Sequence, residues 1–459
     1  MVRTRRGFRA SITGWGLIVP AVLAAMGLAT PAMAQTLQEA LAQAYTSNPQ
    51  LEAQRAALRA VDEQVPQALS NYRPTVEGTA SIGTAEIDVS GAAGAANNGA
   101  RTTQPRTLGI AVTQPIYRGG RTAAQVSRAE NVVQASRAQL FATEQTILLN
   151  AATAYFDVVR DQATLELNTN NEQVIGRQLE ATRDRFRVGE VTRTDVSQAE
   201  SRQAGATSNR ILSEGNLASS RAVYTRIVGS TPGRLTQPRP PFSLPASLQE
   251  TIDLAVAANP SVVASQFNEA AARDAIDQVR GEALPSVSLR GSLQRGLETS
   301  TNAYRTDTGS VTAQLTVPLY QAGAVTSRVR EATQTAGQRR IEIDQARTQT
   351  IETAIRAWQG LTTSRASIQS RQAQVRAAEI ALEGVRQEAT VGSRTTLDVL
   401  DAEQELLNAR VGLVQSQRDE LAAAFQILAA TGQLGARQLN LPVQTYDVEE
   451  NYRSVRDRW

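Results

Sequence analysis

The 459-residue sequence contains no cysteine, no histidine and no lysine, so all 47 of its basic side chains are arginines. Without cysteine and histidine there is no thiolate nucleophile, no imidazole base and no zinc or copper site of the usual ligand types. The absence of lysine excludes Schiff-base chemistry and a phosphate-loop lysine. Only carboxylate chemistry remains open. The composition therefore disfavours an enzyme, and we expect no catalytic residue, no cofactor and no resident metal.

Residues 1–34 have the pattern of a cleavable secretory signal. Four arginines within the first nine residues precede a short apolar run over 17–28, which is followed by Ala32-Met33-Ala34. This pattern predicts cleavage after Ala34, whereas a membrane anchor would need about 20 apolar residues. Removal of the four arginines leaves 43 basic against 44 acidic side chains. The sequence pI of about 9.4 therefore does not indicate nucleic-acid binding, and without cysteine the mature chain cannot be an N-acylated lipoprotein.

Bulky side chains are also scarce. Aromatic residues make up 4% of the chain, and after residue 34 no run of about 18 apolar residues predicts a transmembrane helix. A chain rich in Ala, Gln, Arg and Glu suits long helices better than a thick globular core.

What is present is a tandem repeat of about 200 residues. The matching segments are 37–49 with 248–260, 113–120 with 316–323, and 188–200 with 391–403. The offset falls from 211 to 203 residues, so the first copy has eight residues more, and we place them in a flexible loop around Gly91–Gly99. The predicted organisation is a signal peptide (1–34), a first repeat (35–231), a proline-rich linker (232–246), a second repeat (247–434) and a polar, flexible C-terminal tail (435–459).

The same local patterns occur in both copies. Each copy begins with a predicted helix, 36–70 or 247–283, for which Thr36 and Ser247 are plausible N-caps. Strict apolar–polar alternation predicts strands over 75–82, 107–113, 286–293 and 311–317. Long segments without proline, with apolar residues seven apart, predict coiled-coil helices over 120–188 and 323–391.

The helix lengths indicate how each copy is arranged. After Gly189 or Gly392 the chain turns back into a helix of about 37 residues. The opening and returning helices together are nearly as long as the long helix. We therefore expect the two shorter helices to stack end to end beside it.

Four strands with one apolar face cannot close a barrel alone, because closure takes about eight strands. A soluble two-layer sandwich is one solution, but the chain offers no second sheet to cover the apolar face. An outer-membrane barrel assembled from several protomers fits a secreted chain better, and three copies would supply 12 strands. Tyr117 and Tyr320, just after the strands, are candidates for an interfacial aromatic girdle, with ordinary packing as the alternative.

These features resemble the outer-membrane efflux protein family, the TolC-like exit ducts. The most specific segment is Val391 to Ala402 (VGSRTTLDVLDA), with a weaker counterpart in Val188 to Val196 (VGEVTRTDV). The resemblance implies a mainly α fold with a small β part. It also implies a homotrimer, with a 12-stranded outer-membrane β-barrel that continues into a periplasmic α-helical tunnel. Such ducts dock onto an inner-membrane pump of RND or ABC type and its periplasmic adaptor, and export drugs or polypeptides.

The resemblance also assigns roles at the hairpin turns. In the family the segment matching Asp398 and Asp401 narrows the entrance, and three copies would form an acidic ring that attracts cations. The alternative is that Asp398 caps the returning helix and Asp401 faces water. The family also uses the position of Arg394 to bridge to a neighbour near Thr194 and Asp195, so the resemblance implies that these residues hold the entrance shut. A tyrosine sometimes found in this network corresponds here to Ala389, so part of it is missing.

Two other classes make different predictions. A periplasmic adaptor without a pore would have one coiled-coil hairpin and a lipoyl-like β-domain, whereas this chain has two hairpins. A secreted carboxylate-dependent hydrolase would have an aromatic-rich cleft, which a chain with 4% aromatic residues does not suggest.

Overall fold

The computed structural model describes residues 35–89, 99–238, 244–299 and 305–458. The predicted signal peptide, most of the predicted loop around Gly91–Gly99 and residues 239–243 of the linker lie outside these ranges. Within them, helices predominate and strands form a small part. No helix of the described residues is long and apolar enough to cross a membrane.

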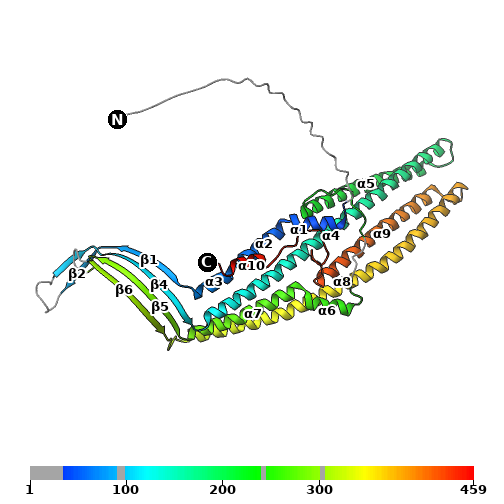
Figure 1. Ribbon diagram of the computed structural model, residues 1–459. Helices are drawn as coiled ribbons and strands as arrows, with labels where there is room; N and C mark the ends of the chain where they lie inside the picture. The colour runs from blue at the N-terminus through cyan, green and yellow to red at the C-terminus, as the bar shows by residue number, and fades with distance from the viewer. Residues whose placement is uncertain (1–34, 90–98, 239–243, 300–304, 459) are drawn as a thin grey trace, which may run out of the picture.

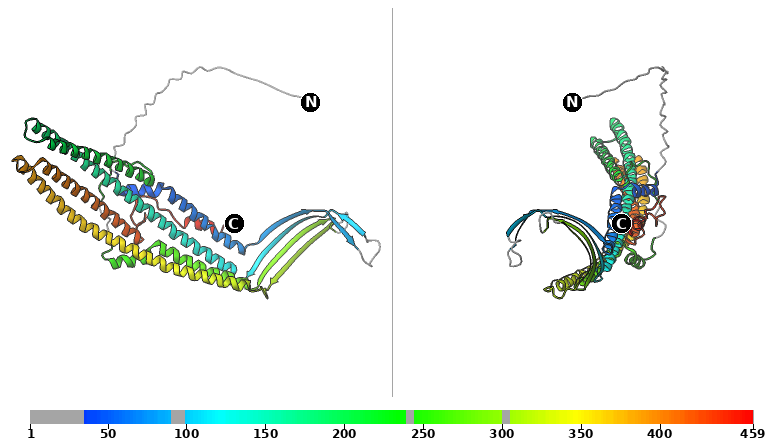
Figure 2. Two further views of the ribbon diagram at one scale, coloured as in Figure 1. Left: turned by 180° about the vertical axis from the view of Figure 1, so that it is seen from behind. Right: turned by 60° about the vertical axis from the view of Figure 1, so that its left-hand side comes forward.

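The molecule is elongated, with a curved sheet at one end and two helical hairpin turns at the other (Figures 1 and 2). Four strands form one antiparallel sheet in the order β1-β4-β5-β6. Their bounds are β1 Thr75–Ile82, β4 Arg106–Arg118, β5 Ser286–Leu297 and β6 Arg305–Thr316. The four predicted strands are confirmed, and the two repeats meet where β4 pairs with β5.

The register places apolar residues opposite apolar residues. Val76 pairs with Val112, and Ile110 pairs with Leu293. The opposite face carries hydroxyl groups, with the Ser292 and Ser310 oxygens 2.8 Å apart. The predicted amphipathic sheet is therefore present, and in one protomer its apolar face is exposed.

A second, two-stranded sheet was not predicted. β2 (Ala85–Val89) pairs with β3 (Gly99–Thr103) and extends the β1–β4 connection. Its strands are only five residues long. The alternation of Ala85, Ile87 and Val89 with Glu86 and Asp88 in β2 was missed, and the polar β3 has no alternating apolar pattern.

Both long helices are confirmed. α4 (Arg121–Arg187) and α8 (Ala324–Thr390) each contain 67 residues, which corresponds to about 100 Å at 1.5 Å per residue. The returning helices are α5 (Arg193–Val228) and α9 (Thr396–Ala430). Each long helix and its returning helix form an antiparallel hairpin.

The opening helices differ from the prediction because each is interrupted by an Asn-Pro pair. The first is divided into α1 (Leu37–Ser47), α2 (Pro49–Asp62) and α3 (Gln64–Leu69), and the second into α6 (Leu248–Ala258) and α7 (Pro260–Arg280). Proline cannot continue a helix but suits its first position, and the preceding asparagine caps it. The predicted caps Thr36 and Ser247 do accept hydrogen bonds from backbone N–H groups.

The same asparagines join the stacked helices. The side-chain amide of Asn48 donates to the carbonyl of Ile227 at 3.1 Å, and that of Asn259 donates to the carbonyl of Ala430 at 3.1 Å. In each repeat the opening helix thus meets the end of the returning helix, which confirms the expected end-to-end stacking.

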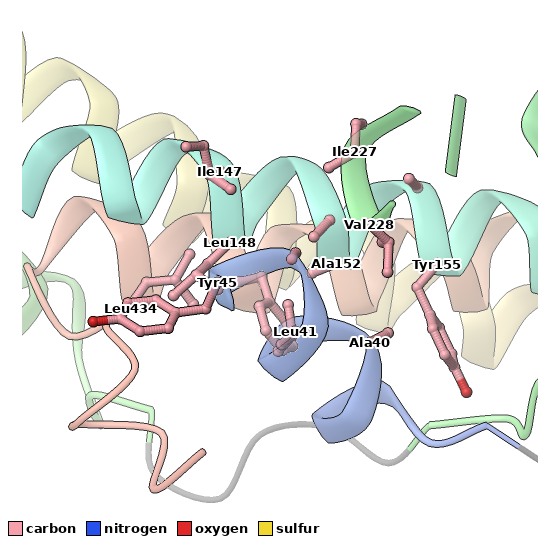
Figure 3. Close-up of a cluster of buried hydrophobic side chains, with 14 of the residues drawn as sticks. Ala40, Leu41, Tyr45, Ile147, Leu148, Ala152, Tyr155, Ile227, Val228 and Leu434 are labelled. Carbon is pink, nitrogen blue, oxygen red and sulfur yellow. The ribbon is translucent and has the colours of Figure 1, made fainter. Parts of the chain in front are cut away.

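The largest hydrophobic core lies where these junctions meet α4. Leu41 and Tyr45 of α1 point toward Leu148 and Ala152 of α4, and Leu434 comes in from the segment after α9 (Figure 3). Tyr155 is fully buried, and its hydroxyl donates to the carbonyl of Thr236 at 2.7 Å. This core ties the start of the first repeat, the linker and the end of the second repeat together.

The C-terminal tail packs against the protein, unlike the free tail expected from its polarity. It ends in α10 (Glu450–Val455), which lies beside α2. Asn451 donates to the carboxylate of Asp62 at 2.8 Å, and Arg456 forms an ion pair with Glu130 at 3.0 Å. These polar contacts hold α10 together with the buried side chain of Val455, and Leu441, Val443 and Tyr446 pack against the largest hydrophobic core. The apolar residues of the tail are irregularly spaced, so the sequence pattern gave no signal for this attachment.

Candidate functional site

The candidate site is the pair of hairpin turns at the end remote from the sheet (Figure 1). Gly189 and Gly392 have φ values of +81° and +80°, in the left-handed region that favours glycine. The backbone N–H after each glycine donates across the turn, from Glu190 to Arg185 at 2.9 Å and from Ser393 to Glu388 at 3.0 Å. These bonds satisfy carbonyls at the end of the long helix and reverse the chain sharply.

Each returning helix then begins with a capping box. Asp195 accepts a hydrogen bond from the backbone N–H of Thr192 at 2.8 Å, and Asp398 accepts one from the backbone N–H of Thr395 at 2.9 Å. In the reverse direction, each aspartate N–H donates to the threonine hydroxyl at 3.3 Å. The backbone hydrogen bond from Thr395 is the main reason why the pKa of Asp398 lies below its ordinary value. Asp398 is therefore ionised at neutral pH and caps α9.

Arg394 has a partner within its own turn. Its Nε donates to the Glu388 carboxylate at 2.8 Å, and both side chains are about half exposed. Within one protomer, the described contacts of Arg394 do not include Thr194 or Asp195. The predicted bridge to a neighbouring hairpin therefore has an intramolecular competitor, Glu388, which sequence reasoning missed although it lies only six residues away.

Asp401 pairs with Arg202 of α5, so this contact joins the two hairpins. Beside it, Leu400 is 1% exposed and packs into a cluster with Ile175, Leu179, Ala199 and Ala206 of the first hairpin. Asp401 was predicted, but Arg202 was missed. The sequence did contain a signal for Arg202. It lies seven residues after Asp195, and this spacing places both side chains on one face of α5.

A second ionic contact joins the hairpins farther from the turns. Arg418 of α9 donates to Asp157 of α4 at 2.8 Å, and Arg160 bonds both Asp157 and Asp161 of its own helix. Among the described residues of one protomer, no group of three or more acidic side chains is placed to hold a metal ion. The chemistry at the turns is thus charge pairing and helix capping.

The two predicted interfacial tyrosines lie at the other end of the helices. Tyr117 is in β4 opposite Val287, and Tyr320 lies between β6 and α8. Their side chains are exposed, Tyr320 at 88%, and the described contacts bring neither near the hairpin turns.

Comparison with known proteins identifies relatives along nearly the whole chain. The family model described as outer membrane efflux protein matches residues 40–230 and 251–433, one match for each repeat. The chain is 34% identical to the outer membrane efflux protein BepC of Brucella suis biovar 1, over 93% of this chain and 92% of that protein. It is 28% identical to the outer membrane protein TolC of Vibrio cholerae, over 91% and 95%.

The fold also matches that of a solved outer membrane channel. The crystal structure of the Campylobacter jejuni CmeC outer membrane channel superposes with a TM-score of 0.78 at 16% identity, covering 92% of this chain and 89% of that one. A strand-and-hairpin repeat used twice is therefore a known channel architecture.

Proposed function

Because the chain belongs to the outer membrane efflux protein family, we propose that it works as a homotrimeric exit duct that discharges small molecules across the outer membrane. An exit duct is the function of this family. Our proposal adds the trimer, the class of cargo, a periplasmic adaptor and an inner-membrane pump as partners, and export after removal of residues 1–34.

The sheet carries the argument for assembly. Its edge strands β1 and β6 each have a neighbour on only one side among the described strands, and large apolar side chains on one face are exposed. The most exposed of these are Val76, Ile82, Leu293, Val311 and Leu315. An apolar face suits lipid, and closure of 12 strands from three copies removes every free edge. Tyr117 and Tyr320 would then lie near the periplasmic interface of the outer membrane.

The hairpins support a tunnel and a gated entrance. Three copies supply six long helices of about 100 Å, each with its returning helix, and Asp398 and Asp401 lie near the narrow end. At that end Arg394 would leave its ion pair with Glu388 and bind Thr194 and Asp195 of a neighbouring hairpin. This contact would hold the entrance closed. Glycine turns with exposed Val188 and Val391 offer the surface for adaptor contact. A pore-free adaptor remains the alternative, but it would leave the apolar sheet face without a role.

Small-molecule efflux is favoured over polypeptide secretion because BepC, at 34% identity, is named an efflux protein. Deletion of the gene should sensitise cells to dyes, detergents or bile salts, and a plasmid copy should restore resistance. Normal resistance together with loss of a secreted polypeptide would replace small molecules by polypeptides as the cargo. If both phenotypes are absent in a strain without paralogues, the duct proposal fails.

A further inference from the structure

We propose that Arg202 sets the ion selectivity of the entrance by neutralising Asp401 from within the same protomer. This inference rests on the proposed entrance, and it changes which of the two aspartates carries the charge there. The ring would present one carboxylate per protomer without an ion-pair partner, Asp398, instead of two. Arg394 lies near Asp398 but forms its ion pair with Glu388.

The contact that carries the inference joins two hairpins at a defined position. The Arg202 guanidinium forms an ion pair with the Asp401 carboxylate, and the side chains are 42% and 54% exposed. A groove of about 430 Å³ lies beside the pair, lined by α5 residues and by Leu397 and Gln404 of α9. The ion pair therefore spans a place where α5 and α9 do not pack closely, and water and ions reach it.

The position of the pair is fixed by its neighbour in the chain. Leu400 is buried against α4 and α5, which orients the start of α9 toward the first hairpin. Asp401 follows directly and meets Arg202. Asp398, in contrast, is held by the backbone and hydroxyl of Thr395, and a capping bond leaves its negative charge in place.

Two other ion pairs near this end lie within single hairpins. Arg183 bonds Glu200 at 2.7 Å across the first hairpin, and Arg386 pairs with Glu403 across the second. Arg183 is 53% exposed, so removal of its charge is a matched control for removal of Arg202. It eliminates one exposed arginine near the same end without uncovering Asp401.

The test is the potassium-to-chloride permeability ratio of the purified full-length channel in planar bilayers, from the reversal potential in a KCl gradient. Arg202→Gln uncovers Asp401 and should raise the ratio, whereas Asp401→Asn leaves Arg202 unpaired and should lower it. Both changes break the same pair, so a mere loosening of the hairpins would move the ratio in one direction for both. Exposed ion pairs shift equilibria by about 1.5- to 5-fold, and we expect changes of this size.

The double variant Arg202→Gln/Asp401→Asn should return close to the wild-type ratio, and Arg183→Gln should change it by less than Arg202→Gln. An unchanged ratio in Arg202→Gln, or a shift in the same direction for both single variants, would overturn the inference. Failure of the wild-type protein to form channels would instead contradict the proposed function.

Discussion

The guanidinium of Arg55 lies 4.6 Å from the ring centre of Tyr45 and 5.3 Å from that of Tyr446. One residue of α2 is thus placed between an aromatic ring of the first helix and one of the C-terminal tail. Arg55 is 8% exposed, and the backbone N–H of Tyr446 donates to the Tyr45 hydroxyl at 3.0 Å. The tail is therefore attached near the middle of the molecule, at the largest hydrophobic core.

Replacement of this ring should release the tail. Tyr446→Ala removes the contact with Arg55, and a partly desolvated cation–π contact is worth about 1–2 kcal/mol. We expect faster trypsin cleavage at Arg453 and Arg456. Tyr446→Phe keeps the ring and should behave like the wild type. Equal cleavage rates in all three proteins would show that other contacts hold the tail.

Attachment of α10 should also depend on pH through Asp62. This carboxyl group is fully buried, Asn451 donates to its Oδ2 at 2.8 Å, and its Oδ1 has no hydrogen-bond partner among the described residues. Burial raises the pKa of Asp62 above its ordinary value of 3.8. A raised pKa in the folded state gives a stabilising contribution that is present below the ordinary pKa and is lost as pH rises through the raised value.

The Asp62→Asn variant keeps an acceptor for Asn451 and has no charge to bury. Hydrogen exchange of the α10 amides, compared with wild type at each pH, should therefore show an advantage for the variant that grows from about pH 4 to pH 7. An advantage that does not change with pH would mean that Asp62 does not titrate in this range.

The proposed entrance-closing role of Arg394 predicts different effects for two substitutions. Arg394→Gln removes the bridge to a neighbouring hairpin and should raise the single-channel conductance. Glu388→Gln removes only the partner within the turn, so it should leave the conductance unchanged or lower it. Each exposed pair is worth about 0.2–1 kcal/mol, and three copies act together. A conductance increase of equal size in both variants would show that the Arg394–Glu388 pair itself keeps the entrance narrow.

The sequence predicted the parts of this fold that follow a regular period. Apolar–polar alternation predicted the four strands, and the absence of proline predicted α4 and α8. The helix lengths predicted that the shorter helices stack end to end. The breaks at Pro49 and Pro260 were missed because the surrounding apolar pattern continues through them. The β2–β3 hairpin was missed because its strands are five residues long and β3 is polar. The attachment of the tail was missed because its core contacts come from irregularly spaced apolar residues.

In the candidate site, too, residues in local motifs were predicted and their long-range partners were missed. Gly189, Gly392, Asp195 and Asp398 occupy local motifs, and the structure defines the turns and caps that they form. The partners Glu388 and Arg202 were missed for different reasons. Glu388 is close to Arg394 in sequence but belongs to no recognisable motif. Arg202 and Asp401 are 199 residues apart in sequence, and they meet only because the two hairpins lie side by side.

The central claim, a duct formed by three chains, is tested most directly by native mass spectrometry of the detergent-extracted full-length protein. One sheet of four strands with two free edges predicts a complex of three times the protomer mass, with no stable monomer at working concentrations. A monomer that keeps its β-content, measured by circular dichroism on the same sample, would contradict the account.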